Sequence, residues 1–246
     1  MIKKRIKKLK SKFIKYNIDG YIIPKNDEFF SEYAVVDRLK IISNFSGSAG
    51  IAIILKKKNY LFVDGRYTLQ AKNQSGNKFQ IHQIPFVTPK KILSKKQKTL
   101  SLGFDPKLFT SRSLNRIIGK QHKLLPIHEN LVDKISIDKK HKNTNYFYVL
   151  SKKVAGNSPK RKIDKLIKIL LKRKIDNIFI SAPENVAWLL NIRGFDNPTS
   201  PIPNCRLLIN KKKKFYLISE FKKLKKLIKE KKIKRNHIIE PNNFEK

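Results

Sequence analysis

The sequence predicts an α/β fold made of two similar domains in tandem, the second of them cut short. Short apolar strand candidates alternate with amphipathic helix candidates along the chain, which is typical of layered α/β and mixed α+β folds. The pattern also restarts near residue 158, so that a helix followed by a strand candidate at 175–180 repeats the arrangement before 18–23. A chain of 246 residues is long enough for one or two such domains.

The first domain is expected to span 1–137 and to begin with a helix. Its apolar residues recur at helical spacing with lysines between them: Ile2, Ile6, Leu9 and Phe13. A buried strand at 20–24 follows, and then a polar segment to residue 44 and a hairpin at 51–63. The remaining elements are expected to be a helix opening at 64, a strand at 80–85, a helix from 89, a strand at 101–104, a helix at 111–118 and a strand at 124–127.

A polar, lysine-rich stretch at 138–157 is interpreted as a linker, and the second domain is expected to span 158–246. Its expected elements are a helix at 158–174, a strand at 175–180, a helix at 183–194 that ends at glycine, a hairpin at 206–218 and a strand at 237–241.

An internal duplication explains the second domain. Three of its elements match the first copy in order, at offsets of about 155–157 residues. The first copy continues after Pro85 through further strands and helices, whereas the second stops at Lys246, where those elements should begin. We therefore predict an incomplete second domain, with an unpaired sheet edge and an uncovered apolar face.

The formal net charge of +39 by itself suggests a polyanion partner. However, basic residues run along the whole chain, and Lys greatly outnumbers Arg, as is typical of an A+T-rich genome. Proteins that read DNA sequence favour Arg for bidentate base contacts. We therefore expect no specific nucleic-acid partner, and a basic polyanion-binding protein remains an alternative.

The cellular location follows from two negative observations. No run of about 18 apolar residues is present, so no membrane span is predicted. The basic start is not followed by the apolar stretch of a signal peptide. The expected location is the cytoplasm, with no membrane partner, and the one cysteine, Cys205, excludes an intrachain disulfide.

The sequence predicts no catalytic residue and no metal ligand. None of the five histidines falls in an HxxxH or HExxH pattern, and no GxSxG nucleophile motif is present. The glycines at 47 and 50 precede a strand without a following Gly-Lys-Ser/Thr, which favours tight packing of a turn over phosphate binding.

Arg66 is the candidate substrate-binding residue. It follows an apolar strand in the segment Asp-Gly-Arg-Tyr at 64–67, where Asp64 can cap a helix and Gly65 allows a sharp turn. Arg66 would then project from the end of the sheet and could bind a carboxylate in bidentate fashion. A structural ion pair is the alternative, and the spacing does not decide between them.

Arg193 is a second candidate, for contact with a substrate or another domain. It stands near the end of the helix at 183–194, before a proline-rich loop at 195–203. The alternative is that its charge complements the helix dipole.

Several segments resemble the first two domains of three-domain Xaa-Pro aminopeptidases (aminopeptidase P). The resemblance is carried by 21–24 with 31–33, by 48–54, by 63–71, by 129–135 and, in the second domain, by 186–194. These matches lie in order and cover almost the whole chain.

The resemblance implies two creatinase/prolidase N-terminal-like domains, each a mixed sheet flanked by helices. The family adds a pita-bread catalytic domain with two divalent metals, usually manganese; its ligand motifs do not occur here, so the chain is expected to be inactive alone. Arg66 carries over as the arginine that contacts the bound peptide. The implied partners are proline-containing peptides, the catalytic domain and a second copy in a homodimer. A stand-alone module that pairs with a separate catalytic chain, or acts as a regulator, is the other alternative.

Overall fold

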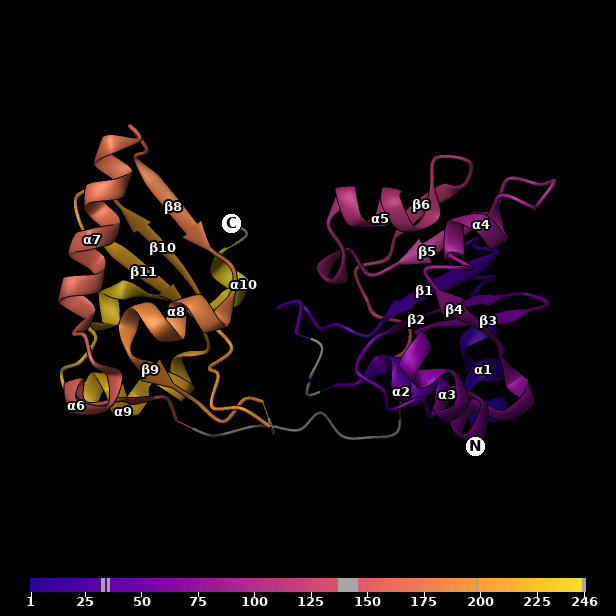
Figure 1. The fold of residues 1–246 in the computed structure, drawn as a ribbon, viewed down its shortest axis with the longest axis horizontal. Helices are drawn as coiled ribbons and strands as arrows, with labels where there is room; N and C mark the ends of the chain where they lie inside the picture. The colour runs from indigo at the N-terminus through magenta and orange to yellow at the C-terminus, as the bar shows by residue number, and fades with distance from the viewer. Residues whose placement is uncertain (32–33, 35, 137–145, 198, 245–246) are drawn as a thin grey trace. The chain divides into compact units, whose positions relative to one another are not determined.

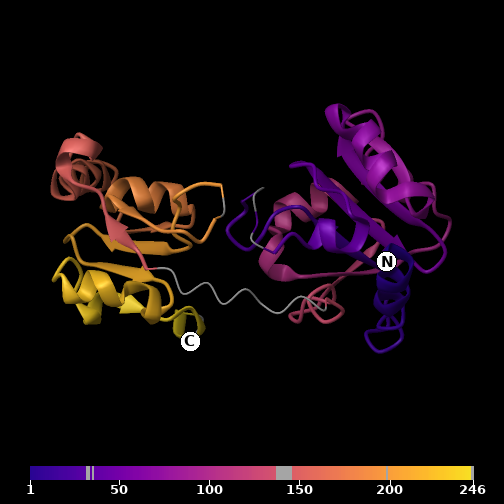
Figure 2. The ribbon, with the colours of Figure 1, turned by 90° about the horizontal axis from the view of Figure 1, so that it is seen from below.

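A computed structural model describes residues 1–31, 34, 36–136, 146–197 and 199–244. The chain divides into two compact units, Met1–Lys140 and His141–Lys246, and each is described here by itself. In both units a sheet is packed against helices (Figures 1 and 2), which confirms the predicted α/β class. Residues 32, 33 and 198 and most of the charged part of the expected linker lie outside the described residues.

The first unit contains a six-stranded sheet in the order β4-β3-β2-β1-β5-β6. Its strands are β1 (Gly20–Pro24), β2 (Gly50–Leu55), β3 (Asn59–Asp64), β4 (Gln80–Ile84), β5 (Ser101–Phe104) and β6 (Lys123–Pro126). Strand β2 is antiparallel to both neighbours, and the other pairs are parallel. The carboxyl ends of all strands except β2 therefore lie at one edge of this sheet.

Helices cover both faces of the first sheet (Figure 1). One core contains side chains of α1 (Ile2–Lys10), α2 (Arg38–Ser43) and α3 (Thr68–Ser75), and the other contains side chains of α4 (Pro89–Leu93) and α5 (Ser111–Ile118). Strand residues alternate between the cores, so that Tyr21 and Ile23 join the first and Ile22 joins the second. Three short 3₁₀ turns, η1 (Gly65–Tyr67), η2 (Gly76–Lys78) and η3 (Pro106–Leu108), complete the unit.

Helix α2 lies in the segment up to residue 44 for which the sequence analysis gave a polar character and no helix. The Asp37 side chain caps it by accepting a hydrogen bond from the backbone amide of Lys40. Leu39 and Ile42 are fully buried, and Asn44 ends the helix in the left-handed conformation. The helix was missed because the three apolar residues of a six-residue helix do not make a visible period.

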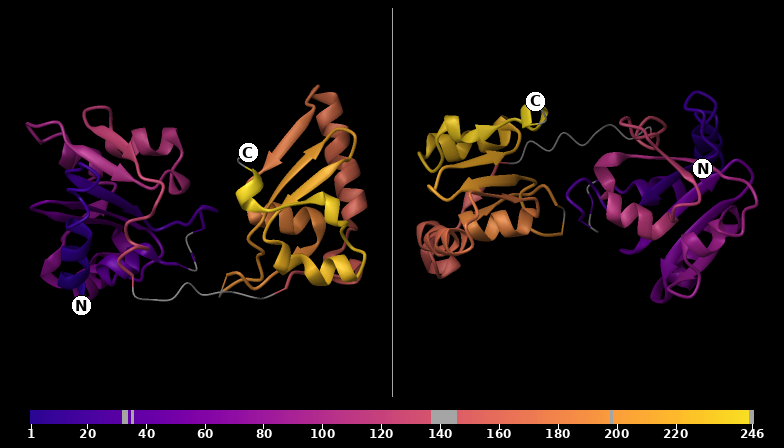
Figure 3. Two further views of the ribbon diagram at one scale, coloured as in Figure 1. Left: turned by 180° about the vertical axis from the view of Figure 1, so that it is seen from behind. Right: turned by 90° about the horizontal axis from the view of Figure 1, so that it is seen from above.

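The second unit contains a four-stranded sheet in the order β12-β11-β10-β8, with β8 at its margin (Figures 1 and 3). Its strands are β8 (Asn177–Ile180), β10 (Arg206–Asn210), β11 (Phe215–Ile218) and β12 (Ile238–Ile239). Its helices are α6 (Lys152–Ala155), α7 (Pro159–Lys172), α8 (Pro183–Leu190), α9 (Phe221–Lys229) and α10 (Pro241–Phe244), with the turn η4 (Arg235–His237). A separate ladder joins β7 (Tyr148–Val149) to β9 (Ile192–Arg193).

The strand registers confirm the duplication. Tyr21 of β1 pairs with Ile54 of β2, and Ile178 of β8 pairs with Ile209 of β10 in the same antiparallel arrangement. The hairpin to β11 and the parallel pairing of β11 with β12 then repeat β2, β3 and β4. In the part of the chain that the structure describes, β8 has no partner on the side where β5 pairs with β1.

Three element boundaries differ from the sequence analysis. The expected linker at 138–157 contains β7 and α6, because Phe147 is fully buried and β7 pairs with β9. Helix α8 ends at Asn191, which adopts the left-handed conformation, before Gly194 is reached. The last strand is shorter than 237–241 because α10 begins at Pro241.

Candidate binding site at the carboxyl edge of the first sheet

In open α/β sheets, ligands bind outside the carboxyl ends of the strands, where the chain turns to opposite sides of the sheet. In the first sheet this point lies between β1 and β5, because β1 leads to β2 on one side and β5 leads to β6 on the other. The segments that leave these strands carry most of the polar side chains discussed below. The edge is therefore our candidate site.

Arg66 lies at this edge, directly after β3. Its Nε donates a hydrogen bond of 2.8 Å to Oδ1 of Asp64, and the two side chains are 72% and 41% exposed. The same Asp64 oxygen accepts the backbone amide of Arg66 at 3.0 Å, so Asp64 is the predicted cap. The hydrogen bonds from Arg66 hold the pKa of Asp64 below its usual value.

The residues that surround Arg66 are in close contact with one another. Its guanidinium carbon lies 5.4 Å from the ring centroid of Tyr67, whose hydroxyl lies 3.0 Å from Oγ of Ser48. A Cβ at Gly47 would lie 2.3 Å from the Phe45 ring, so the turn before β2 needs glycine there. This contact confirms that the glycine turn packs tightly.

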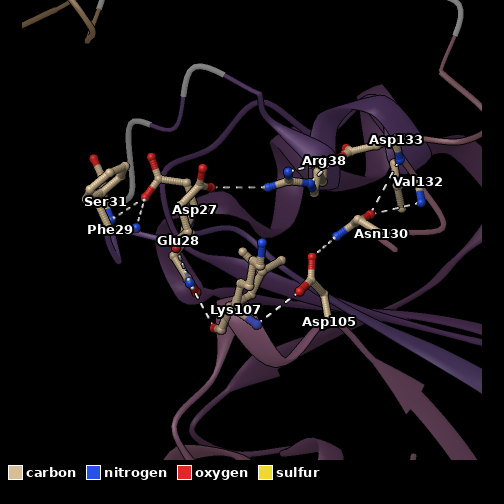
Figure 4. Close-up of polar contacts among 12 residues, drawn as sticks. Asp27, Glu28, Phe29, Ser31, Arg38, Asp105, Lys107, Asn130, Val132 and Asp133 are labelled. Atoms are coloured by element: carbon tan, nitrogen blue, oxygen red, sulfur yellow. Dashed lines mark hydrogen bonds and ion pairs between the residues drawn. The ribbon is translucent and has the colours of Figure 1, made fainter. Parts of the chain in front are cut away.

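Asp27 organises the segment that leaves β1. Its Oδ1 accepts the backbone amides of Phe29 at 2.9 Å and Ser31 at 3.1 Å (Figure 4). The residue is 6% exposed, and burial raises the pKa of its carboxyl. The segment is thus held in shape by a buried carboxyl group.

Arg38 forms a bidentate, largely buried ion pair near the switch point. Its Nε and Nη2 each donate a 2.8 Å hydrogen bond to Asp133, and its Nη1 lies 3.9 Å from Glu28 (Figure 4). Burial lowers the pKa of Arg38, but the hydrogen bonds that it donates to Asp133, together with the negative charges of Asp133, Glu28 and Asp105, raise the pKa overall. This guanidinium is 11% exposed and its planar fork is already filled by a carboxylate.

A second buried pair joins the segments that follow β5 and β6. Asn130 donates a hydrogen bond of 2.9 Å to Asp105, which is 4% exposed and also accepts the amide of Lys107. Across the β1–β5 gap, Asn26 donates to the carbonyl oxygen of Leu108 at 3.0 Å. The switch point is therefore filled by internal hydrogen bonds.

These contacts distinguish Arg38 from Arg66 by the ligands that each side chain can bind. Arg38 binds a carboxylate within the fold, whereas Arg66 is exposed and its pair with Asp64 lies in water. An exposed pair contributes only about 0–1 kcal/mol, so another carboxylate can compete for Arg66 at little cost. The cluster of Arg38, Asp133 and Glu28, called the Arg38 cluster below, was not predicted from the sequence because Arg38 and Asp133 are far apart in the chain.

Arg193 lies in the second unit, on β9. Its Nη1 donates to the carbonyl oxygens of Ala187 at 3.0 Å and Ile192 at 2.8 Å. Ala187 belongs to the last turn of α8, where a cation is favourable. The structure places Arg66 and Arg193 in separate units.

The described residues contain no group of three or more His, Cys, Asp or Glu side chains placed to hold a metal ion. The side chains present therefore do not form the two-metal ligand set that the resemblance implies for the catalytic domain. In the same part of the chain, no helix is both long and apolar enough to cross a membrane.

Two family models match the chain, and both describe the creatinase/prolidase N-terminal domain. One matches residues 5–135 and the other matches residues 138–244. Together they place one such domain in each unit.

The chain is also similar to full-length proteins from fungi and plants. A probable Xaa-Pro aminopeptidase P of Coprinopsis cinerea is 32% identical over 210 residues, which are 81% of this chain and 34% of that protein. Aminopeptidase P1 of Lotus japonicus is 32% identical over 214 residues, which are 83% of this chain and 32% of that protein. The chain thus spans about a third of the length of these relatives.

Among solved structures, the X-prolyl aminopeptidase of Caenorhabditis elegans is similar in fold. It matches 98% of this chain and 42% of its own chain, with a TM-score of 0.84 and 24% identity. That protein is described as a cytosolic enzyme with a di-nuclear active site.

Proposed function

The chain belongs to the creatinase/prolidase N-terminal domain family, and from this premise we propose that it is the non-catalytic N-terminal portion of an Xaa-Pro aminopeptidase. The observation that carries the proposal is that more than four fifths of this chain, with its two matched domains in tandem, aligns with only about a third of relatives named Xaa-Pro aminopeptidase P and aminopeptidase P1. The parent enzyme would remove the first residue of peptides whose second residue is proline. The two domains of this chain would be 1–137 and 158–246, and the segment at 138–157 that joins them would contribute β7 and α6 to the second unit.

Arg66 would contribute to the substrate cleft by binding a carboxylate of the peptide. Its exposure, the weak competing pair with Asp64 and its place at the carboxyl edge of the sheet support this role. The planar fork of a guanidinium matches a carboxylate in bidentate fashion. Arg193 would make a second contact, with substrate or with the catalytic domain.

The hydrolytic chemistry would lie in the catalytic region of the longer enzyme. Two divalent ions, such as manganese, activate water and stabilise an oxyanion in sites of that kind. The present chain would supply a cleft wall and surfaces for a homodimer. We place the enzyme in the cytoplasm, in line with the description of the Caenorhabditis elegans relative as cytosolic.

Two preparations test the proposal. Purified 1–246 with manganese should release no first residue from an Xaa-Pro peptide, and metal-dependent release would refute the non-catalytic assignment. A fusion of 1–246 to the catalytic region of the Aspergillus oryzae relative, which is 35% identical over 209 residues, should be active. The intact relative is the control. If the relative cleaves the peptide and the fusion does not, this chain does not serve as the N-terminal portion.

A further inference from the structure

The exposed apolar side chains of the first unit gather at one edge of its sheet. In the described part of this unit, five large apolar residues are more than half exposed: Met1, Ile14, Phe30, Leu69 and Phe86. The last three follow the carboxyl ends of β1, β3 and β4, whereas Met1 and Ile14 precede β1. Single apolar residues are normal on a protein surface, but a group of them at the edge where ligands bind indicates a contact site.

Two members of this group, Leu69 and Phe86, accompany Arg66 in the fold. Leu69 follows Arg66 by three residues, across the turn η1 and the start of α3, so the two side chains project from the same helical face. Asp64 of β3 is the parallel partner of Ile84 of β4, so Arg66 and Phe86 each come two residues after a matched pair. The three side chains therefore leave neighbouring strands at the same level of the edge.

The segments that leave β3 and β4 also contact each other. A Cβ at Gly65 would lie 2.6 Å from Nε2 of Gln83, so the turn before Arg66 packs directly on β4. Helix α3 contacts β4 as well. The side chain of Arg66 is 72% exposed, and Leu69 and Phe86 are each 70% exposed. A cation and two apolar groups are thus presented to solvent over a short stretch of the edge.

This combination is complementary to a ligand that carries a carboxylate and an apolar group close together. The C-terminal residue of a peptide carries both groups on one Cα atom when its side chain is apolar. An internal Asp or Glu offers the carboxylate to a guanidinium, but its own side chain adds no large apolar group. Burial of an apolar side chain against two others is favourable in addition to the charged contact.

We propose that Arg66, Leu69 and Phe86 form a subsite for the C-terminal residue of the substrate peptide, whose carboxylate binds Arg66 and whose apolar side chain packs on Leu69 and Phe86. The inference rests on the proposed function, since it names the peptides that the longer enzyme selects. The peptide carboxylate replaces that of Asp64, whose exposed pair with Arg66 is weak. Arg66 then requires a free carboxyl end, and Leu69 and Phe86 determine which side chain is preferred there.

N-acetylleucine tests the subsite in 1–246 without a catalytic region, because it carries a carboxylate and a leucine side chain on one Cα atom. Its addition should shift the backbone amide resonances of 66, 69 and 86, and the shifts should saturate. N-acetylleucinamide should bind about tenfold or more less tightly, since it lacks the charged acceptor. N-acetylglycine should bind about fivefold or more less tightly, since it has no side chain to bury.

Variants of 1–246 separate the two parts of the subsite. Leu69→Ala and Phe86→Ala should each weaken N-acetylleucine binding by about threefold or more and leave N-acetylglycine binding nearly unchanged. Arg66→Ala should weaken the binding of both. Ile14→Ala is the matched apolar control, because Ile14 is 87% exposed and lies before β1, and Arg116→Ala in α5 is the exposed cation control. Melting temperatures check that each variant is folded.

The active fusion with a catalytic region gives the corresponding kinetics. Among Ala-Pro peptides compared at each of several lengths, kcat/KM should be about fivefold or more higher with Leu than with Gly at the C-terminus. Phe86→Ala should reduce this ratio, whereas Ile14→Ala should not. Amidation of the C-terminus should lower kcat/KM by about tenfold or more, and an internal Glu should not restore it.

Equal binding of N-acetylleucine and N-acetylglycine, or the absence of shifts at 66, 69 and 86, would overturn the proposal. It would also be overturned if an amidated peptide with an internal Glu were cleaved as well as the free acid, because an acidic side chain would then occupy Arg66. Saturable shifts with an inactive fusion would count against the proposed function alone. An active fusion with no C-terminal preference at any length would count against the subsite alone.

Discussion

Arg38 and Asp133 are joined by two hydrogen bonds of 2.8 Å, although 95 residues separate them in the sequence. The pair ties the start of α2 to the last segment of the first domain. Because Arg38 also lies near Glu28, it fixes three segments around the switch point of the sheet. Their relative positions should therefore depend on this one side chain.

We expect Asp133→Ala to destabilise the first domain more than Arg38→Ala does. Asp133→Ala leaves a guanidinium that is 11% exposed without its bidentate partner, whereas Arg38→Ala leaves a carboxylate that is 33% exposed. Hydrogen bonds to charged groups contribute about 1.5–3 kcal/mol, which sets the scale of the loss. Urea unfolding of both variants measures it, with Arg112→Ala in α5 as the exposed control. Equal, small losses would contradict the assignment.

Asp27→Asn should make the protein more stable at neutral pH. The amide oxygen can still accept both backbone amides that Oδ1 accepts, and the buried negative charge is removed. In the unfolded protein the pKa of an aspartate carboxyl is about 4. In the folded protein, burial raises the pKa of Asp27 above that value. The wild-type protein therefore loses stability as the pH rises from the pKa of Asp27 in the unfolded protein through its pKa in the folded protein.

The advantage of Asp27→Asn should accordingly vanish at a pH below the unfolded pKa and grow to a plateau above the folded pKa. Free energies of unfolding measured from acid to neutral pH check this trend. Asp64→Asn is the control, because the pKa of Asp64 is lowered and its trend should be absent or reversed. An advantage that stays constant with pH would show that the ionisation of Asp27 is not its cause.

Arg66→Ala, made in the active fusion with a catalytic region, should lower kcat/KM for an Xaa-Pro peptide by about tenfold or more. Arg66→Lys should restore only part of the loss, because an ammonium cannot present the planar fork. The melting temperature should barely change, since the side chain is 72% exposed. A lower melting temperature with normal kinetics would make Arg66 a structural residue.

The second domain should melt before the first. Its four-stranded sheet has a partly exposed face, whereas the six-stranded first sheet is covered on both faces. Trp188 lies in the second unit and is the single tryptophan, so its fluorescence reports on that unit alone. We expect the fluorescence transition below the main circular dichroism transition, and a fragment 1–137 that keeps the upper one. Coincident transitions would refute the prediction.

The sequence predicted those elements whose information is local. Helix α5 begins and ends where its apolar spacing placed it, and both hairpins lie between strands of clear apolar character. The position of Arg66 after a buried strand and the Asp64 cap also followed from neighbouring residues.

The Arg38 cluster could not be predicted, because it depends on pairing across the chain. Asp105 follows β5 and Asn130 follows β6, and Asp133 meets Arg38 only once β6 lies beside β5. Short elements such as β7 were not predicted for a related reason. A strand of two residues shows no apolar periodicity in the sequence, and it finds its partner only in the folded unit.

The two copies differ by two residues in the length of chain between their first two paired strands, β1 and β2 in the first copy and β8 and β10 in the second. Ile178 follows its counterpart Tyr21 by 157 residues, whereas Ile209 follows Ile54 by 155, and the pairing of these residues is nonetheless the same. Residues have thus been gained or lost in the connections, while a shift of one residue within a strand would turn every side chain to the opposite face. The exposed part of the connection between α8 and β10, at Thr199 to Pro201, is therefore a natural place to insert a peptide tag, and a single-residue deletion within β10 should abolish folding of the second domain.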